Sequence, residues 1–170
     1  MNILLVNDDG YGSVGIILLE RLLKHYGDVY VVAPREHQSG KGCSILLQRS
    51  YDYQMVDDHH YIVSGTPTSC TMFGLSALGI KFDLVVSGCN DGINEGIDTM
   101  YSGTCGACFE ALFQRVPAIA FSCDSNFSIV EENFNRVMDA ILVNGFISSE
   151  YMLNVNFPIG DEIKGILLTK

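Results

Sequence analysis

Features that mark several protein classes are missing from this sequence of 170 residues. No apolar run approaches the roughly 18 to 20 residues that a helix needs to span a bilayer, so no membrane segment is expected. The N-terminus lacks a basic region followed by an apolar core and a cleavage site, so we expect no signal peptide and predict a cytoplasmic location. Because no repeat, low-complexity tract or linker is found, residues 1–170 are predicted to form a single domain.

Positive charge is also scarce. Ten Lys and Arg residues stand against 20 Asp and Glu residues, which gives a formal net charge of −10. Nucleic-acid-binding proteins usually carry a basic surface, so neither a nucleic acid polymer nor a membrane is expected as a partner. A small phosphate ester can still bind where a cation or a helix N-terminus offsets the negative field locally.

A disulfide framework is not expected. A chain of this length with 48% hydrophobic residues can bury a core without crosslinks. We therefore predict that the cysteines are reduced thiols and that several are buried as small apolar side chains. Cys105 and Cys108 have CxxC spacing, so a redox role is an alternative to buried helical thiols. The cysteines are Cys43, Cys70, Cys89, Cys105, Cys108 and Cys123.

The first ten residues organise the chain, because the aliphatic run 3–6 leads directly into Asn7-Asp8-Asp9-Gly10. A short apolar run that ends in turn residues predicts a strand buried on both faces. Ligands of open α/β sheets bind outside the carboxyl ends of the strands. Two carboxylates about 4 Å apart repel by about 4 kcal/mol at an effective dielectric of ~20, which favours a hard divalent cation between Asp8 and Asp9. A turn that only caps a helix is the alternative.

The rest of the chain alternates predicted strands and helices, which indicates an α/β fold with a mainly parallel sheet covered on both sides. The first helix is predicted to bury a stripe that includes Val14, Ile17, Leu18 and Leu22. Thr66 and Pro67 predict a helix start. Further strands are predicted at 28–33, 82–87, 117–122, 153–157 and 165–169, a hairpin extension at 45–63 with strands 45–50, 51–56 and 61–63, and helices at 14–26, 67–78, 105–115 and 131–146.

Three polar loops are predicted to meet at the carboxyl edge of the sheet: Asp8-Asp9, Ser39-Gly40 and 87–90. Their ligand atoms are oxygens, which suit Mg²⁺ or Mn²⁺ and not Zn²⁺. Residues 102–104 begin a helix and offer hydroxyl and N–H groups to an anion. A cation beside an anion pocket is the arrangement of metal-assisted phosphoryl hydrolysis, with Asp8 as the candidate to orient or deprotonate the attacking water.

Other interpretations stay open from the residues alone. Gly10, Gly12 and Gly15 match the dinucleotide pattern, so a non-catalytic nucleotide-binding α/β module is the alternative function, although the two aspartates would repel a pyrophosphate. His37 can be a proton donor or a solvated loop residue. The pair His59-His60 is typical of a solvated turn more than of a metal site.

Five motifs follow one another along the chain: Asn7-Asp8-Asp9-Gly10, Ser39-Gly40, Gly65-Thr66-Pro67, the segment Ser87 to Asn94, and Tyr101-Ser102-Gly103-Thr104. Together they resemble the SurE family of stationary-phase survival proteins, which are metal-dependent 5′/3′-nucleotidases. The resemblance implies a Rossmann-like three-layer α/β/α sandwich. It also implies hydrolysis of nucleoside monophosphates to nucleoside and phosphate, with activity on short polyphosphate in addition.

The resemblance further implies site residues and assembly. One Mg²⁺ or Mn²⁺ per subunit would be held by Asp8, Asp9, Ser39 and Asn90, and the phosphate would be held by Asn94, Ser102, Gly103 and Thr104. Family members form dimers or tetramers, partly by exchanging a C-terminal extension. This chain is shorter than the family pattern, so we expect the extension to be absent from it, and a homodimer or homotetramer if the native protein has one.

Overall fold

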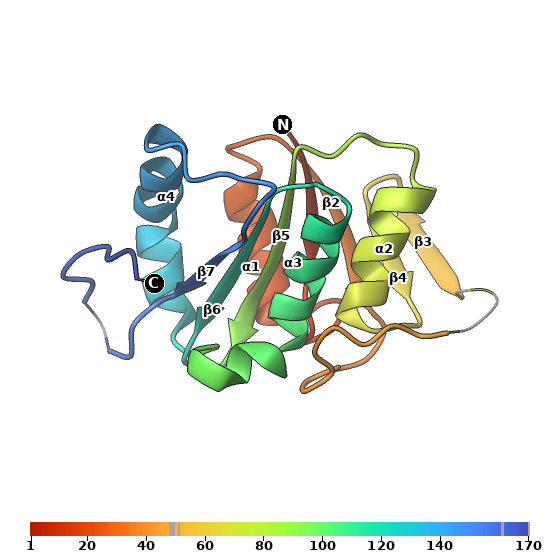
Figure 1. Cartoon of the computed structure of the whole chain (residues 1–170), viewed down its shortest axis with the longest axis horizontal. Coiled ribbons are helices and arrows are strands. Elements are labelled where there is room, and N and C mark those ends of the chain that lie inside the picture. Colours follow the sequence, from red (N-terminus) through yellow and green to blue (C-terminus); the bar gives the residue numbers. More distant parts are fainter. Residues whose placement is uncertain (48–49, 51, 161, 170) are drawn as a thin grey trace.

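The computed structural model describes residues 1–47, 50, 52–160 and 162–169, which form a seven-stranded sheet flanked by helices (Figure 1). None of the helices in these ranges is both long enough and apolar enough to cross a membrane. The strands are β1 (Asn2–Val6), β2 (Asp28–Pro34), β3 (Tyr53–Asp57), β4 (His60–Val63), β5 (Leu84–Asp91), β6 (Ala118–Cys123) and β7 (Leu153–Asn156). The helices are α1 (Val14–Leu23), α2 (Pro67–Ala77), α3 (Gly103–Phe113), α4 (Phe127–Val143) and the short 3₁₀ helix η1 (Gly96–Met100).

The sheet has the strand order β3-β4-β2-β1-β5-β6-β7. Every neighbouring pair is parallel except β3 and β4, which are antiparallel. Helices α1 and α4 pack on one face of the sheet, and α2 and α3 pack on the other. The predicted α/β fold with a mainly parallel sheet covered on both sides is confirmed.

The central strand β1 explains why the sheet has two cores. Ile3 and Leu5 belong to the core under α1 and α4, while Leu4 and Val6 belong to the core under α2 and α3. Successive side chains of a strand point to opposite faces, so a strand covered on both sides needs apolar residues at every position. This is the reason that its sequence is a continuous aliphatic run.

The position of β1 also determines where a ligand can bind. From β1 the chain passes through α1 to β2, which is the neighbour of β1 on one side within the sheet. It later returns through α2 to β5, which is the neighbour of β1 on the other side. The two crossover helices lie on opposite faces of the sheet. A crevice at such a switch point, outside the carboxyl ends of the strands, is where open α/β sheets bind ligands. The candidate site is therefore expected between the ends of β1 and β5.

Several predicted elements need correction. Residues 45–47 are not a strand, and Gln48, Arg49 and Tyr51 lie outside the described residues. The predicted hairpin is present as β3 and β4, but β4 pairs with β2, so the hairpin forms one edge of the main sheet. Residues 165–169 are not a strand, and Leu167 is 84% exposed. An apolar run becomes a strand only where another strand offers hydrogen bonds, which local sequence does not reveal.

The helices also differ in detail. The predicted stripe of α1 was partly wrong, since Val14 and Ile17 are exposed, while Ile16 and Leu19 enter the core. The helix is apolar around most of its circumference, so its periodicity does not define one buried face. Helix α4 starts four residues before the predicted position 131 and ends at Val143. The predicted start of α2 is confirmed: the Thr66 side chain accepts a hydrogen bond from the Ser69 N–H.

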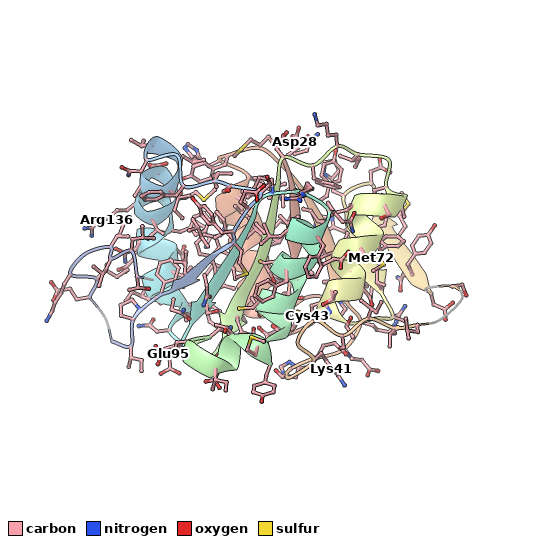
Figure 2. The ribbon with its side chains drawn as sticks, in the orientation of Figure 1. Asp28, Lys41, Cys43, Met72, Glu95 and Arg136 are labelled. Carbon is pink, nitrogen blue, oxygen red and sulfur yellow. The ribbon has the colours of Figure 1, made fainter. Side chains whose placement is uncertain are left out.

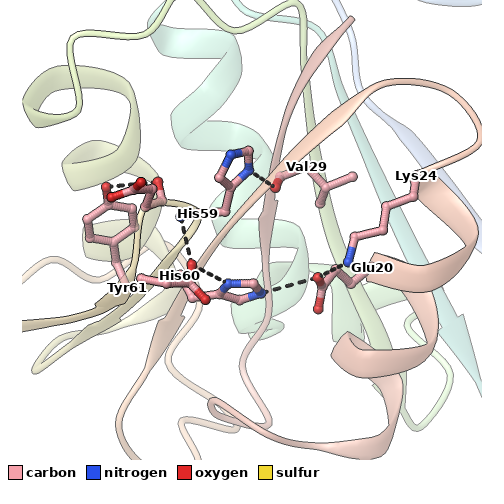
Figure 3. A network of polar contacts seen from close by, with 8 residues as sticks. Glu20, Lys24, Val29, His59, His60 and Tyr61 are labelled. Carbon is pink, nitrogen blue, oxygen red and sulfur yellow. Dashed lines mark hydrogen bonds and ion pairs between the residues drawn. The ribbon is translucent and has the colours of Figure 1, made fainter.

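The β3–β4 hairpin is tied to α1 through His60 (Figure 3). The His60 Nδ1 atom lies 2.7 Å from Asp57 Oδ1, and its Nε2 atom lies 3.2 Å from Glu20 Oε1. Glu20 also accepts a hydrogen bond of 2.6 Å from Lys24. One imidazole thus joins two carboxylates that belong to β3 and α1.

His60→Ala is expected to loosen this edge of the sheet. The hydrogen bond from His60 lowers the pKa of the exposed Asp57 carboxyl. The bond therefore stabilises the fold at pH values above the ordinary carboxyl pKa. This contribution is lost as the pH falls through the lowered pKa of Asp57. Hydrogen exchange at neutral pH should show faster exchange of the β3 and β4 amides and unchanged exchange in β1 and β5. Asp58→Asn, in the same turn, is the control. Unchanged exchange in β3 and β4 of the His60 variant would contradict the tether.

Candidate active site

A buried asparagine shapes the turn that follows β1. The Asn7 Nδ2 atom donates to Gly10 O at 2.9 Å and to Ser13 Oγ at 2.8 Å, so the side chain closes the turn and ties it to the start of α1. Gly10 has φ of +96°, a conformation that other residues rarely adopt. The turn takes Asp8 and Asp9 out of the strand, which ends at Val6. Both side chains can face one site only outside the strand, because neighbouring side chains within a strand point to opposite faces. Sequence reasoning assigned no role to the Asn7 side chain.

Asp8 lies against the N-terminus of α3. Its side chain is buried, and Oδ1 accepts a hydrogen bond of 2.6 Å from the Thr104 hydroxyl. A Cβ atom built on Gly103 would lie 2.9 Å from Asp8 Cβ and 3.1 Å from Asp8 Oδ2, which shows how closely the helix approaches. Burial raises the pKa of the Asp8 carboxyl, and the hydrogen bond from Thr104 opposes this in part.

Asp9 stands beside Asp8 and is partly buried. Its Oδ2 atom accepts a hydrogen bond of 3.3 Å from the Asp91 N–H, and its Oδ1 atom lies 3.5 Å from His37 Nδ1. Burial raises the pKa of the Asp9 carboxyl, and the negative charge of Asp8 raises it further. Within the described residues, neither aspartate forms an ion pair with a lysine or an arginine. The two neighbouring acids are therefore held at the edge of the sheet without a lysine or arginine to compensate their charge.

The loop after β2 brings Ser39 to the same place. The Gln38 N–H donates to the Asp8 carbonyl at 2.7 Å, which fixes the loop against the β1 turn. Ser39 Oγ lies 2.7 Å from His37 Nε2, and the other ring nitrogen of His37 faces Asp9. Further along the loop, the Gly42 N–H donates to Tyr101 O at 2.8 Å, just before α3. The predicted meeting of the first two loops is thus present, with His37 between them.

Asn90 closes the site from β5. The pairing of β5 with β6 shifts register between Ser87 and Asn90, and the Asn90 side chain is buried. Its Nδ2 atom donates to Gly92 O at 2.7 Å, so the amide oxygen is the atom left to accept or coordinate. Because Asp91 follows Asn90 and bonds to Asp9, the ends of β1 and β5 are joined directly. Figure 2 shows this edge, with Lys41, Cys43 and Glu95 labelled, opposite the edge that carries Asp28.

Asn94 is held more firmly than the sequence suggested. Its N–H donates to Asn156 Oδ1 at 2.8 Å, and its carbonyl accepts from the side chains of Asn154 at 2.7 Å and Asn156 at 2.9 Å. Its own Nδ2 atom donates to Ser122 Oγ at 2.9 Å. β7 therefore supports the loop that follows β5. Alternation in the sequence identified β7 as a strand but gave no sign of this contact.

The N-terminus of α3 differs from the expected anion site in one respect. Ser102 caps the helix by accepting a hydrogen bond of 3.1 Å from the Cys105 N–H, which leaves its hydroxyl hydrogen free to be donated elsewhere. The first N–H groups of a helix have no intrahelical acceptor, and Gly103 supplies the first of them. The Thr104 hydroxyl, however, is fully buried and bonds to Asp8. Thr104 therefore orients the carboxylate, and Ser102 and Gly103 are left for an anion.

The donor set fits a hard divalent cation. Carboxylate, hydroxyl and amide oxygens are the ligands that Mg²⁺ and Mn²⁺ prefer. Two neighbouring acids, one buried and one partly buried, without a lysine or arginine partner would be stabilised by such an ion. Among the residues that the structure describes, no group of three or more His, Cys, Asp or Glu side chains is arranged to hold a metal. A cation at this edge would therefore depend on Ser39 and Asn90 in addition to Asp8 and Asp9.

The features behind the alternative interpretations have structural roles. Cys105 and Cys108 are free and fully buried in α3, and burial raises the pKa of both thiols, which does not suit thiol exchange. Gly15, the last glycine of the dinucleotide-like pattern, lies where α1 approaches β5: a Cβ built there would be 1.9 Å from Cys89 O. All six cysteines are free thiols, and all but Cys43 are buried, as predicted.

Several known proteins are similar to this chain in sequence. The protein named "5'-nucleotidase SurE" of Neisseria gonorrhoeae is 37% identical over 176 residues, covering 100% of this chain and 71% of the relative. The protein of the same name from Acinetobacter baylyi is 38% identical, and the match covers 99% of this chain and 70% of the relative. The one from Idiomarina loihiensis is 39% identical, and the match covers 100% of this chain and 70% of the relative.

A solved structure, "Crystal Structure of Sure Protein from Aquifex aeolicus", matches with a TM-score of 0.84 and 38% identity. The match covers 93% of this chain and 66% of the solved one, so the chain spans about two thirds of the length of that relative. The family model described as "Survival protein SurE" matches residues 3–170. Because that match extends over nearly the whole sequence, the chain belongs to the SurE family.

Proposed function

We propose that this protein is a metal-dependent phosphomonoesterase that hydrolyses nucleoside 5′- and 3′-monophosphates to nucleoside and phosphate. The observation that supports it most is a pair of neighbouring acids, the buried Asp8 and the partly buried Asp9, without a lysine or arginine partner among the described residues. Asp8 is held at the N-terminus of α3. The relatives named 5'-nucleotidase SurE support the same activity. One Mg²⁺ or Mn²⁺ would be held by Asp8, Asp9, Ser39 and Asn90.

Asp8 is proposed as the residue that orients or deprotonates the attacking water. Its Oδ1 atom is held by Thr104, which leaves Oδ2 for the water. Burial raises the pKa of this carboxyl in the metal-free protein. When bound, the cation would supply the positive charge that polarises the phosphoryl oxygens and activates water.

The phosphoryl group is proposed to bind at the start of α3. Ser102 donates its free hydroxyl hydrogen, and the Gly103 N–H points along the helix axis, where the helix dipole favours negative charge. Such fixed donors stabilise the charge that develops on the phosphoryl oxygens. Asn94, fixed by four hydrogen bonds, contributes the second hydrogen of its amide group.

Phosphate release tests this proposal. The protein is treated with EDTA and assayed with 5′- and 3′-AMP, GMP, CMP and UMP, and with tripolyphosphate, before and after Mn²⁺ or Mg²⁺ is added. We expect release from the monophosphates to fall by at least about 100-fold with EDTA and to return with the cation. Release that EDTA leaves unchanged would contradict the metal dependence. Nucleotide binding with no release under any condition would support a non-catalytic nucleotide-binding module.

The finer parts of the proposal stay predictions. Release from tripolyphosphate in the same assay would support the additional activity on short polyphosphate. Light scattering of the native protein would test the homodimer or homotetramer, and the cytoplasmic location needs fractionation of the source cells.

A further inference from the structure

His37 lies between two of the residues proposed to hold the cation. Its Nε2 atom is 2.7 Å from Ser39 Oγ, and its Nδ1 atom is 3.5 Å from Asp9 Oδ1. We propose that His37 is a positioning residue that accepts the Ser39 hydroxyl hydrogen and so directs a lone pair of Ser39 toward the cation. This inference rests on the proposed function, because Ser39 matters only if a cation binds.

The positions of the hydrogens decide what His37 can do. A hydroxyl that coordinates a cation must present a lone pair to it and direct its hydrogen to another acceptor. At 2.7 Å, His37 Nε2 is such an acceptor for Ser39, provided that the ring carries its hydrogen on Nδ1. That nitrogen faces the Asp9 carboxylate, which attracts an N–H and repels a lone pair. Asp9 therefore favours the tautomer that leaves Nε2 free to accept.

The loop holds this arrangement through its backbone. Gln38, between His37 and Ser39, donates its N–H to the Asp8 carbonyl at 2.7 Å. Gly40, the residue after Ser39, has φ of +73°, a backbone conformation that favours glycine. The His37 side chain itself is 61% exposed, so replacing it removes little packing. Its variants are therefore expected to fold normally.

Three substitutions separate the two contacts of the ring. His37→Gln places an amide oxygen near the position of Nε2 and keeps an acceptor for Ser39. His37→Asn places its amide near the position of Nδ1 and keeps only the contact with Asp9. His37→Ala removes both, and His25→Ala removes an exposed histidine elsewhere as the control.

Manganese affinity is the readout, measured without substrate from the EPR signal of free Mn²⁺. We expect His37→Ala and His37→Asn to bind Mn²⁺ about tenfold more weakly, the lower end of effects seen for residues that orient metal ligands. His37→Gln and His25→Ala should bind within about threefold of the unsubstituted protein. Equal affinity of all these variants would overturn the inference, as would a loss in His37→Gln as large as in His37→Ala.

A double substitution shows whether His37 acts through Ser39. In a protein that carries Ser39→Ala, adding His37→Ala should cause no further loss of Mn²⁺ affinity, because the hydroxyl to be oriented is gone. An equal tenfold loss in both backgrounds would overturn the inference. If the unsubstituted protein binds Mn²⁺ and hydrolyses nucleotides while the His37 variants match it, the proposed function stands and only this inference fails. If it binds no Mn²⁺, both fail.

Discussion

Asp8→Asn is expected to lower metal-dependent phosphate release by at least about 10³-fold and, at the same time, to raise the melting temperature of the metal-free protein. The loss of activity follows from the proposed role of Asp8, since an amide cannot accept the proton of the attacking water and is a weaker ligand for a cation. Phosphate release from 5′-AMP with saturating Mn²⁺ measures it.

The gain in stability follows from the sign of the pKa shift. Burial raises the pKa of the Asp8 carboxyl, so the folded protein binds this proton more tightly than the unfolded chain. The free energy of unfolding of the metal-free protein therefore increases as the pH falls through the raised pKa, and at neutral pH the ionised group destabilises the fold. An asparagine removes the charge beside Asp9 and can still accept the hydrogen bond from Thr104. We expect a rise in Tm of a few degrees at pH 7.

The dependence on Mn²⁺ separates this explanation from a general effect on packing. The cation should raise the Tm of the unsubstituted protein, because a ligand that binds only the folded state stabilises it, and should raise that of Asp8→Asn much less. Asp28→Asn, an exposed aspartate at the opposite edge of the sheet, is the matched control and should change neither activity nor Tm. Asp8→Asn with unchanged turnover would contradict the role given to Asp8, and a lower Tm without metal would contradict the electrostatic explanation.

The parts of the fold that could be predicted were those where burial leaves a direct pattern in the sequence. β1, β2, β5 and β6 are covered on both faces, and each contains a continuous run of apolar residues. The same reasoning failed for residues 165–169, which are equally apolar but have no strand beside them in the sheet. It failed in α1 as well, because apolar residues surround that helix and Ile17 could not be distinguished from Ile16 by spacing.

The site shows the same limit. Asp8, Asp9 and Asn90 could be brought together from sequence because parallel strands end at one edge, so residues that follow the strands meet there. The direction of each side chain could not be predicted. Thr104 turns to Asp8 and not to an anion. Asn156, more than 60 residues from Asn94, fixes it by a contact that no local pattern indicates.

Gly103→Ala is the second substitution expected to have a large effect, because it adds a single methyl group against Asp8. That Cβ would lie 2.9 Å from Asp8 Cβ, which is closer than such atoms approach each other. It would also lie 3.0 Å from Pro67 Cγ and 3.1 Å from Asp8 Oδ2, which are unusually tight contacts. The aspartate or the helix must move. A displacement of about 1 Å in a reacting group can cost about 10²-fold in rate, so we expect turnover to fall by about that factor or more.

Two further variants test whether Gly103→Ala lowers turnover through its contact with Asp8. Alanine is the better helix former by about 1 kcal/mol, so helix propensity alone predicts no loss of turnover. Gly165→Ala controls for the loss of glycine flexibility, because the Cβ added there meets nothing within 4 Å. In the Asp8→Asn background, adding Gly103→Ala should lower the remaining phosphate release little further, because residues that act as one unit are not additive. A second loss of about 100-fold in that background would mean that the added methyl group also displaces the Gly103 N–H from the phosphoryl group, and that the effect does not pass through the Asp8 carboxylate alone.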